Sequence, residues 1–154
     1  MPETSDRLKD RLRADLTTAM KGRDELSTAT LRMVLSAVSA EEVAGKEARE
    51  LSDDDVQAVL RREAKKRREA AEAFAGAGRA EQAERERAEE GVIAGYLPAQ
   101  LEDADLAAIV ADVVTSTGAS GMKDMGRVMG AVTAKVAGRA EGGRVAAEVR
   151  RQLG

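Results

Sequence analysis

The 154-residue chain contains no cysteine and no histidine. These absences exclude disulfides, thiolate nucleophiles, imidazole general bases and the usual zinc ligands. A carboxylate site for Mg²⁺ is still chemically possible, but no cluster of Asp and Glu residues in the sequence indicates one. We therefore predict no metal site, no cofactor and no catalytic residue.

Long apolar runs are also missing. No stretch approaches the ~20 apolar residues that a membrane-spanning helix needs, and residues 1–10 form a polar segment unlike a signal peptide. The sequence thus predicts a cytoplasmic protein without membrane contact. The net charge of −3 argues against strong unaided binding of DNA or RNA, because proteins that bind nucleic acid alone are usually basic.

Proline and aromatic residues are rare, being limited to Pro2, Pro98, Phe74 and Tyr96. Apolar residues recur at three- and four-residue steps through most of the chain, as they do on one face of a helix. No alternating strand pattern occurs. The sequence therefore predicts an all-α fold with a core of Leu, Val, Ile, Met and Ala.

Four helices are predicted before Pro98, over the approximate ranges 4–22, 27–44, 52–74 and 79–95. Thr4 or Ser5 is the expected cap of the first helix, and Gly22 its expected end. The clearest start is at Ser52, because Asp55 follows three residues later and completes part of a capping box.

Pro98 interrupts the helical pattern, so we predict a domain boundary there. The N-terminal helical domain is expected to cover residues 1–97 and the C-terminal domain residues 98–154. Three short helices are predicted in the second domain, the first ending at Gly118 and the others carrying apolar residues over 125–132 and 145–153. A core of this size is marginal on its own.

Three segments occur in order in the second half: YLPAQL at residues 96–101, KDMGRVM at 123–129 and KVAGRA at 135–140. As a set they resemble the YqeY family, and the C-terminal half is similar to the tail of the GatB subunit of aspartyl/glutamyl-tRNA amidotransferase. The N-terminal half resembles YqeY through LRM at 31–33, LSDDDV at 51–56 and AGR at 77–79. Glu102, Ala137 and Glu141 depart from the family pattern, where Ser, Lys and Asp are expected.

The resemblance implies an accessory role. In the amidotransferase, the GatB tail helps to engage tRNA, whereas the amidase site lies on another subunit and the kinase-like part of GatB activates the charged tRNA. This chain resembles neither catalytic part. The expected partners are therefore tRNA, bound weakly and with help from a partner protein, and possible amidotransferase subunits.

The predicted RNA-binding residues lie beyond Gly118, in a segment that contains seven basic and three acidic residues. They are Lys123, Arg127, Lys135, Arg139 and Arg144. Contact with phosphates, and not reading of bases, is expected, because this segment has no aromatic residue.

Two glycines, Gly126 and Gly130, lie four residues apart in the predicted sixth helix, where each is unfavourable for helix stability. They allow either close approach of an RNA or protein partner to the backbone or tight packing between helices. The neighbouring Met125 and Met129 are expected in the core.

The third helix carries a basic run at residues 61–68, interpreted mainly as a solvated face. Arg67 differs, because its position falls within the apolar stripe. A guanidinium there requires a carboxylate partner. We therefore predict a structural ion pair at Arg67.

Two alternative functions stay open. One is carbon–nitrogen ligase activity with glutamine as the amido-N-donor, exerted as part of a complex. On its own the chain offers neither a cysteine nor a Ser–Ser–Lys arrangement to activate as a nucleophile. The other is a helical protein–protein adaptor without RNA contact, which the acidic net charge would suit.

Overall fold

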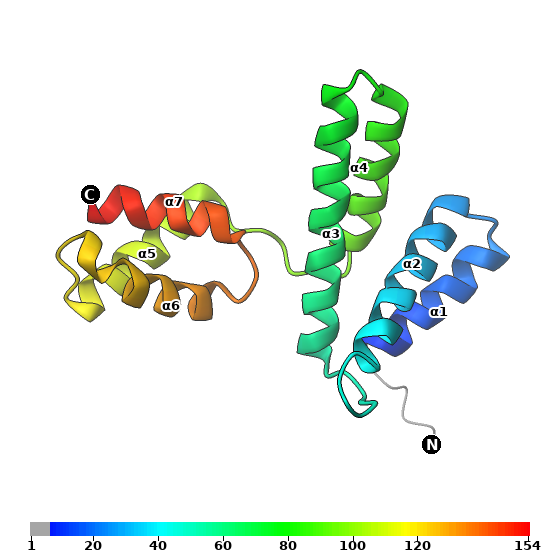
Figure 1. Ribbon diagram of the computed structural model, residues 1–154, viewed down its shortest axis with the longest axis horizontal. Coiled ribbons are helices and arrows are strands. Elements are labelled where there is room, and N and C mark those ends of the chain that lie inside the picture. Colours follow the sequence, from blue (N-terminus) through cyan, green and yellow to red (C-terminus); the bar gives the residue numbers. More distant parts are fainter. Residues whose placement is uncertain (1–6) are drawn as a thin grey trace. The chain divides into compact units, whose positions relative to one another are not determined.

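The computed structural model describes residues 7–154, which form seven α-helices and one 3₁₀ turn without any strand (Figure 1). The all-α prediction is confirmed. The elements are, in chain order, α1 Leu8–Lys21, α2 Glu25–Glu42, α3 Asp53–Gly76, α4 Ala80–Ala94, α5 Asp103–Thr117, η1 Met122–Asp124, α6 Met125–Val136 and α7 Gly142–Leu153.

The chain divides into two compact units, the first ending at Leu97 and the second beginning at Pro98. In the first unit, α1 pairs with α2 and α3 pairs with α4, each pair forming an antiparallel hairpin (Figure 1). Leucine and valine side chains from α1, α2 and α3, together with Ile93 of α4, form its core. Alanines lie between α3 and α4, since Ala71 and Ala83 are buried. Small side chains allow two helices to pack closely.

Local side-chain capping sets two helix starts, those of α2 and α3. Ser52 and Asp55 exchange two hydrogen bonds of 3.2 Å, so the capping box at α3 is complete although Asp replaces the usual Glu. These bonds hold the pKa of the Asp55 carboxyl below its ordinary value. The cap of α2 is Asp24, whose carboxylate accepts the Ser27 N–H, so α2 begins slightly earlier than predicted.

The start of α1 depends on tertiary structure. Thr4 and Ser5, the predicted caps, lie outside the described residues. The first N–H of α1, that of Leu8, is bonded to the Asp53 carboxylate at 3.1 Å. A residue from the start of α3 thus satisfies a backbone donor that α1 itself leaves free.

The second unit is a bundle in which α5, α6 and α7 each pack against the other two. Its buried core consists mainly of valines from all three helices. Met125 and Met129 are half-buried against this core. Within residues 7–154, no helix combines the length and apolar character required to cross a membrane.

Candidate nucleic-acid interface

Helix α6 is strongly two-sided. Val128, Val132 and Val136 are buried on one side, whereas Gly126 and Gly130 are exposed on the other. A Cβ atom built on either glycine would meet no atom within 4 Å. Tight packing between helices within this unit, one of the two predicted explanations, therefore does not account for these glycines, and their backbone lies open at the surface.

Three of the five predicted cations lie on the same stretch of chain as this bare backbone. Lys123 in η1 and Arg127 and Lys135 in α6 are all exposed. Arg127 Nη2 lies 3.0 Å from Asp124 Oδ1. The backbone N–H of Ser120, followed by the charges of Arg127 and Lys123, lowers the pKa of the Asp124 carboxyl.

The two lysines are available to another molecule. Among residues 7–154, neither the Lys123 nor the Lys135 ammonium has a carboxylate oxygen within 4 Å. We name Lys123, Arg127 and Lys135, together with Gly126 and Gly130, the α6 surface.

The other two predicted cations bind backbone carbonyls of their own unit. Arg139 donates from Nε to the Val136 carbonyl at 3.1 Å and from Nη2 to that of Lys135 at 3.4 Å, and thereby caps the end of α6. Arg144 donates from Nη2 to the Leu101 carbonyl at 2.8 Å. It also pairs with the Asp103 carboxylate at 2.9 Å. These contacts are structural.

Two further hydrogen bonds join two of the motifs that are far apart in the sequence. The Leu101 N–H donates to the Arg139 carbonyl at 2.7 Å, and the Gln100 amide reaches the Gly138 carbonyl at 3.5 Å. The chain reverses beyond α6 through Ala137 and Gly138, which both have positive φ angles, of 50° and 79°. YLPAQL and KVAGRA therefore form one structural joint, a relationship for which the sequence carried no signal.

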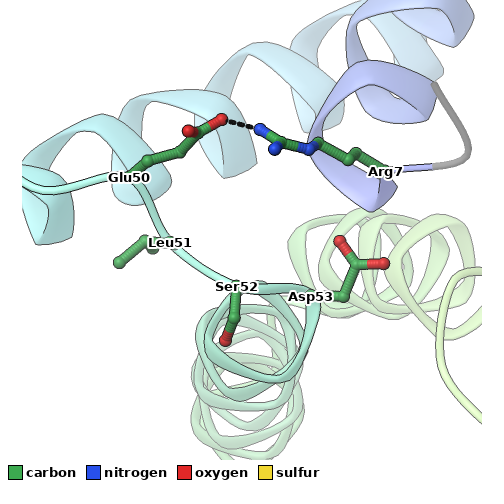
Figure 2. A pocket seen from close by; sticks show the side chains of 5 residues that line it. All are labelled: Arg7, Glu50, Leu51, Ser52 and Asp53. Atoms are coloured by element: carbon green, nitrogen blue, oxygen red, sulfur yellow. Dashed lines mark hydrogen bonds and ion pairs between the residues drawn. The ribbon is translucent and has the colours of Figure 1, made fainter.

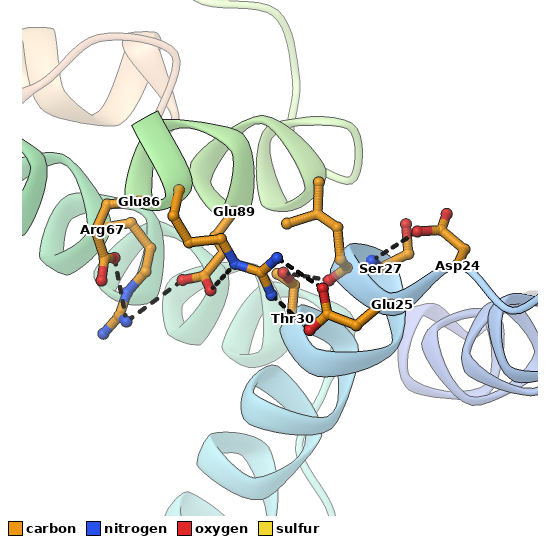
Figure 3. A network of polar contacts seen from close by, with 9 residues as sticks. Asp24, Glu25, Ser27, Thr30, Arg67, Glu86 and Glu89 are labelled. Atoms are coloured by element: carbon orange, nitrogen blue, oxygen red, sulfur yellow. Dashed lines mark hydrogen bonds and ion pairs between the residues drawn. The ribbon is translucent and has the colours of Figure 1, made fainter. Parts of the chain in front are cut away.

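Arg67 lies between two carboxylates of α4 (Figure 3). Its Nη1 is 3.4 Å from Glu86 Oε2 and 3.7 Å from Glu89 Oε2, and 22% of its side chain is exposed. Sequence analysis missed Arg85, which bonds Glu89 at 3.1 Å and Glu25 at 2.7 and 2.9 Å. The bonds to Glu25 and then Glu89 raise the pKa of Arg85. The network links α2, α3 and α4.

The basic run of α3 is largely neutralised. Arg62 pairs with Glu41, Lys65 with Glu69, Lys66 with Glu63 and Arg68 with Glu90, at distances of 3.0 to 3.8 Å. This helix therefore presents far less free positive charge than its sequence indicates.

A shallow surface pocket of about 270 Å³ lies where α3 begins (Figure 2). It is lined by Arg7, Glu50, Leu51, Ser52 and Asp53. Arg7 is paired with Glu50, and Asp53 accepts the N–H of Leu8. These charged groups serve the contact between the starts of α1 and α3, and they do not form a nucleophile–base pair. In residues 7–154, no group of three or more carboxylates is placed to hold a metal ion.

Comparison with curated proteins gave no match. A family model described as Yqey-like protein matches residues 9–153. The match covers both structural units and all three C-terminal motifs. The protein therefore belongs to the YqeY-like family.

Proposed function

We propose that this chain is an accessory RNA-binding module that contacts tRNA weakly, together with a partner protein, in glutamine-dependent tRNA amidation. It is not catalytic on its own. The observation that carries the proposal is the α6 surface, where the exposed Lys123 and Arg127 are sequence neighbours of a backbone without side chains and Lys135 adds a third exposed cation further along α6. Gly126 and Gly130 are not explained by packing, and an approaching phosphate strand would use the space they leave.

The charges set the expected strength of binding. Arg127 is paired with Asp124, so the two available lysines of the α6 surface would neutralise about two phosphates. Each contact contributes a slope of roughly −0.7 to −0.9 to the dependence of log affinity on log salt. The net charge of −3 opposes approach to RNA at longer range. Weak binding that fades towards physiological salt follows, and a partner protein would supply the remaining affinity.

The link to amidation rests on membership of the YqeY-like family and on the resemblance of the C-terminal motifs to the GatB tail. Subunits of a tRNA-dependent amidotransferase are the proposed protein partners. Any amide transfer would take place on such a partner, because this chain lacks the cysteine and histidine that commonly supply and activate a nucleophile.

The test is a titration of the full-length protein with tRNA transcripts at several low salt concentrations. A Lys123→Gln/Lys135→Gln variant removes two charges without disturbing an ion pair. We expect it to bind all tRNAs more weakly and to reduce the salt slope by about 1.4 to 1.8. Arg139 is unsuitable for this test, because its guanidinium caps α6.

Arg87→Gln is the control for loss of positive charge elsewhere, since it removes one exposed cation from α4 of the other unit. It should leave tRNA affinity unchanged. Unaltered affinity in the double lysine variant, or no binding by the unmodified protein at low salt, would contradict the proposal and favour a protein–protein adaptor.

A further inference from the structure

Helix α1 ends in a Schellman motif with an unusual residue at its left-handed position. The Asp24 N–H donates to the Ala19 carbonyl at 2.9 Å, and the Arg23 N–H donates to that of Met20 at 3.3 Å. These two bonds define the motif. Arg23 occupies its left-handed position with a φ of 56°.

Two other helices of this chain end in the same motif with glycine at that position. They use Gly78 after α3 and Gly118 after α5, with φ angles of 75° and 68°. At the end of α1 the glycine lies one residue earlier, and Gly22 has an ordinary φ of −80°. The predicted stop at Gly22 thus coincides with the helix end. However, it is Arg23 that adopts the left-handed conformation, which is unfavourable for residues other than glycine.

A residue other than glycine costs stability in this conformation, and such positions cluster at functional sites. Arg23 is exposed, as are Lys21 and Arg32. Arg32 Nη2 lies 3.8 Å from the sulfur of Met20, whose residue is 49% exposed. Met20 and Lys21 end α1, Arg23 lies in the turn that follows, and Arg32 reaches Met20 from α2. We name these four residues the turn patch.

The acids next to the turn patch are held by other groups. The Asp24 carboxylate accepts the Ser27 N–H at 3.1 Å. Glu25 is bonded through both oxygens to Arg85. Throughout residues 7–154, no carboxylate oxygen lies within 4 Å of the charged groups of Lys21, Arg23 or Arg32. Three cations are left available at the end of one hairpin.

We infer that the turn patch is a second RNA-backbone contact, located in the N-terminal unit. The inference rests on the proposed function and adds a site to it. Guanidinium groups bond phosphate oxygens through two donors at once, and two of the three cations are arginines. Two weak contacts on one chain reinforce each other when a single RNA engages both, because the first contact then raises the effective concentration of RNA at the second.

Arg23→Gly separates binding from folding. Glycine suits the left-handed conformation, so we expect the melting temperature to stay equal or to rise by about 2–4 °C. The affinity for a tRNA transcript at low salt should nevertheless fall roughly threefold to tenfold, and the salt slope should decrease by about 0.7 to 0.9. Lys46→Gly, the matched control, removes one cation from an exposed loop of the same unit and should change neither affinity nor slope.

The variants of the two sites give distinguishable results. Wild-type affinity in Arg23→Gly, with loss in the Lys123→Gln/Lys135→Gln variant, would overturn this inference alone. The reverse pattern would support the turn patch and overturn the α6 surface. No binding of tRNA by the unmodified protein would overturn both proposals. Unchanged tRNA affinity in Arg23→Gly overturns the inference even if that variant binds a protein partner differently. If Arg23→Gly fails to fold, Lys21→Gln/Arg32→Gln gives the same test.

Discussion

The hydroxyl of Tyr96 donates a 2.6 Å hydrogen bond to Oδ2 of Asp15, across 81 residues of sequence. The guanidinium carbon of Arg11 lies 4.8 Å from the centroid of the same ring, a cation–π arrangement. Tyr96 and Leu97 pack against the core of the first unit, whereas Leu101 packs against that of the second. The YLPAQL motif is therefore anchored at both ends, one in each unit.

This anchoring predicts an unusual titration of Tyr96. Burial, followed by the bond to Asp15, raises the pKa of the Tyr96 hydroxyl well above its ordinary value of 10.0. Because the unfolded chain ionises first, this contribution to stability is present below pH 10 and is lost as the pH rises further. Tyr96 is the only tyrosine and tryptophan is absent, so ultraviolet absorbance reports it directly. Asp15→Asn should lower the observed pKa towards 10, and an unchanged pKa would contradict the bond.

Arg67 is expected to stabilise the α3–α4 hairpin. Arg67→Ala leaves the half-buried Glu86 and Glu89 without that partner, and should lower the free energy of unfolding by about 1–3 kcal/mol. The double variant Arg67→Met/Glu86→Gln should lose less free energy of unfolding than Arg67→Ala. Methionine keeps the aliphatic length of the arginine, and glutamine removes the charge that Arg67 balanced. Urea unfolding of the single and double variants measures this coupling. Strict additivity of the substitutions would show that the charges do not interact.

The exposed glycines of α6 are expected to limit stability. Gly130→Ala should raise the free energy of unfolding by about 0.8–1.0 kcal/mol, because alanine favours a helix interior and a Cβ meets no neighbour. Gly126→Ala should give a smaller gain, because Gly126 lies in the first turn of α6. Thermal unfolding followed by circular dichroism tests this. Gly22→Ala is the comparison, since its Cβ would lie 3.4 Å from the Thr18 carbonyl oxygen, and a smaller gain is expected there.

Acid should weaken the end of α7. The bonds from Arg151 and then Gln152 lower the pKa of Glu148 to about 2, from an ordinary value of 4.5. A lowered carboxyl pKa contributes stability that is present above pH 4.5 and is lost as the pH falls towards 2. The melting temperature of the wild-type protein should therefore fall more steeply over this interval than that of Glu148→Gln. Parallel pH profiles would count against the contribution of Glu148.

The predicted domain boundary leads to a test with a fragment. If residues 98–154 are an independent domain, the fragment should be helical alone, since its three helices enclose their own core. Its stability is expected to be only a few kcal/mol, because so short a chain buries little apolar surface. Circular dichroism with urea unfolding measures both. A fragment without helix content at 10 °C would show that the first unit is required.

Local features were predictable from the sequence by itself. The apolar period of 3.6 residues determined that the fold is all-α and which faces are buried, as at Val128 and Val132. Ser52 and Asp55 determined the start of α3, because both partners of a capping box lie within one helical turn. The motifs YLPAQL, KDMGRVM and KVAGRA indicated the YqeY-like family, because a set of short motifs in a fixed order can be recognised without knowledge of the three-dimensional structure.

Only the tertiary structure decided what each cation does. Lys135 and Arg139 lie four residues apart in sequence, yet Lys135 is exposed and Arg139 caps the helix before it. Likewise, Arg144 reaches Leu101 across 43 positions. A long flexible side chain has many rotamers, and which carbonyl or carboxylate it meets depends on the packing of distant segments. Charge counted along a sequence therefore states how many cations exist, whereas the fold determines which of them stay free to bind.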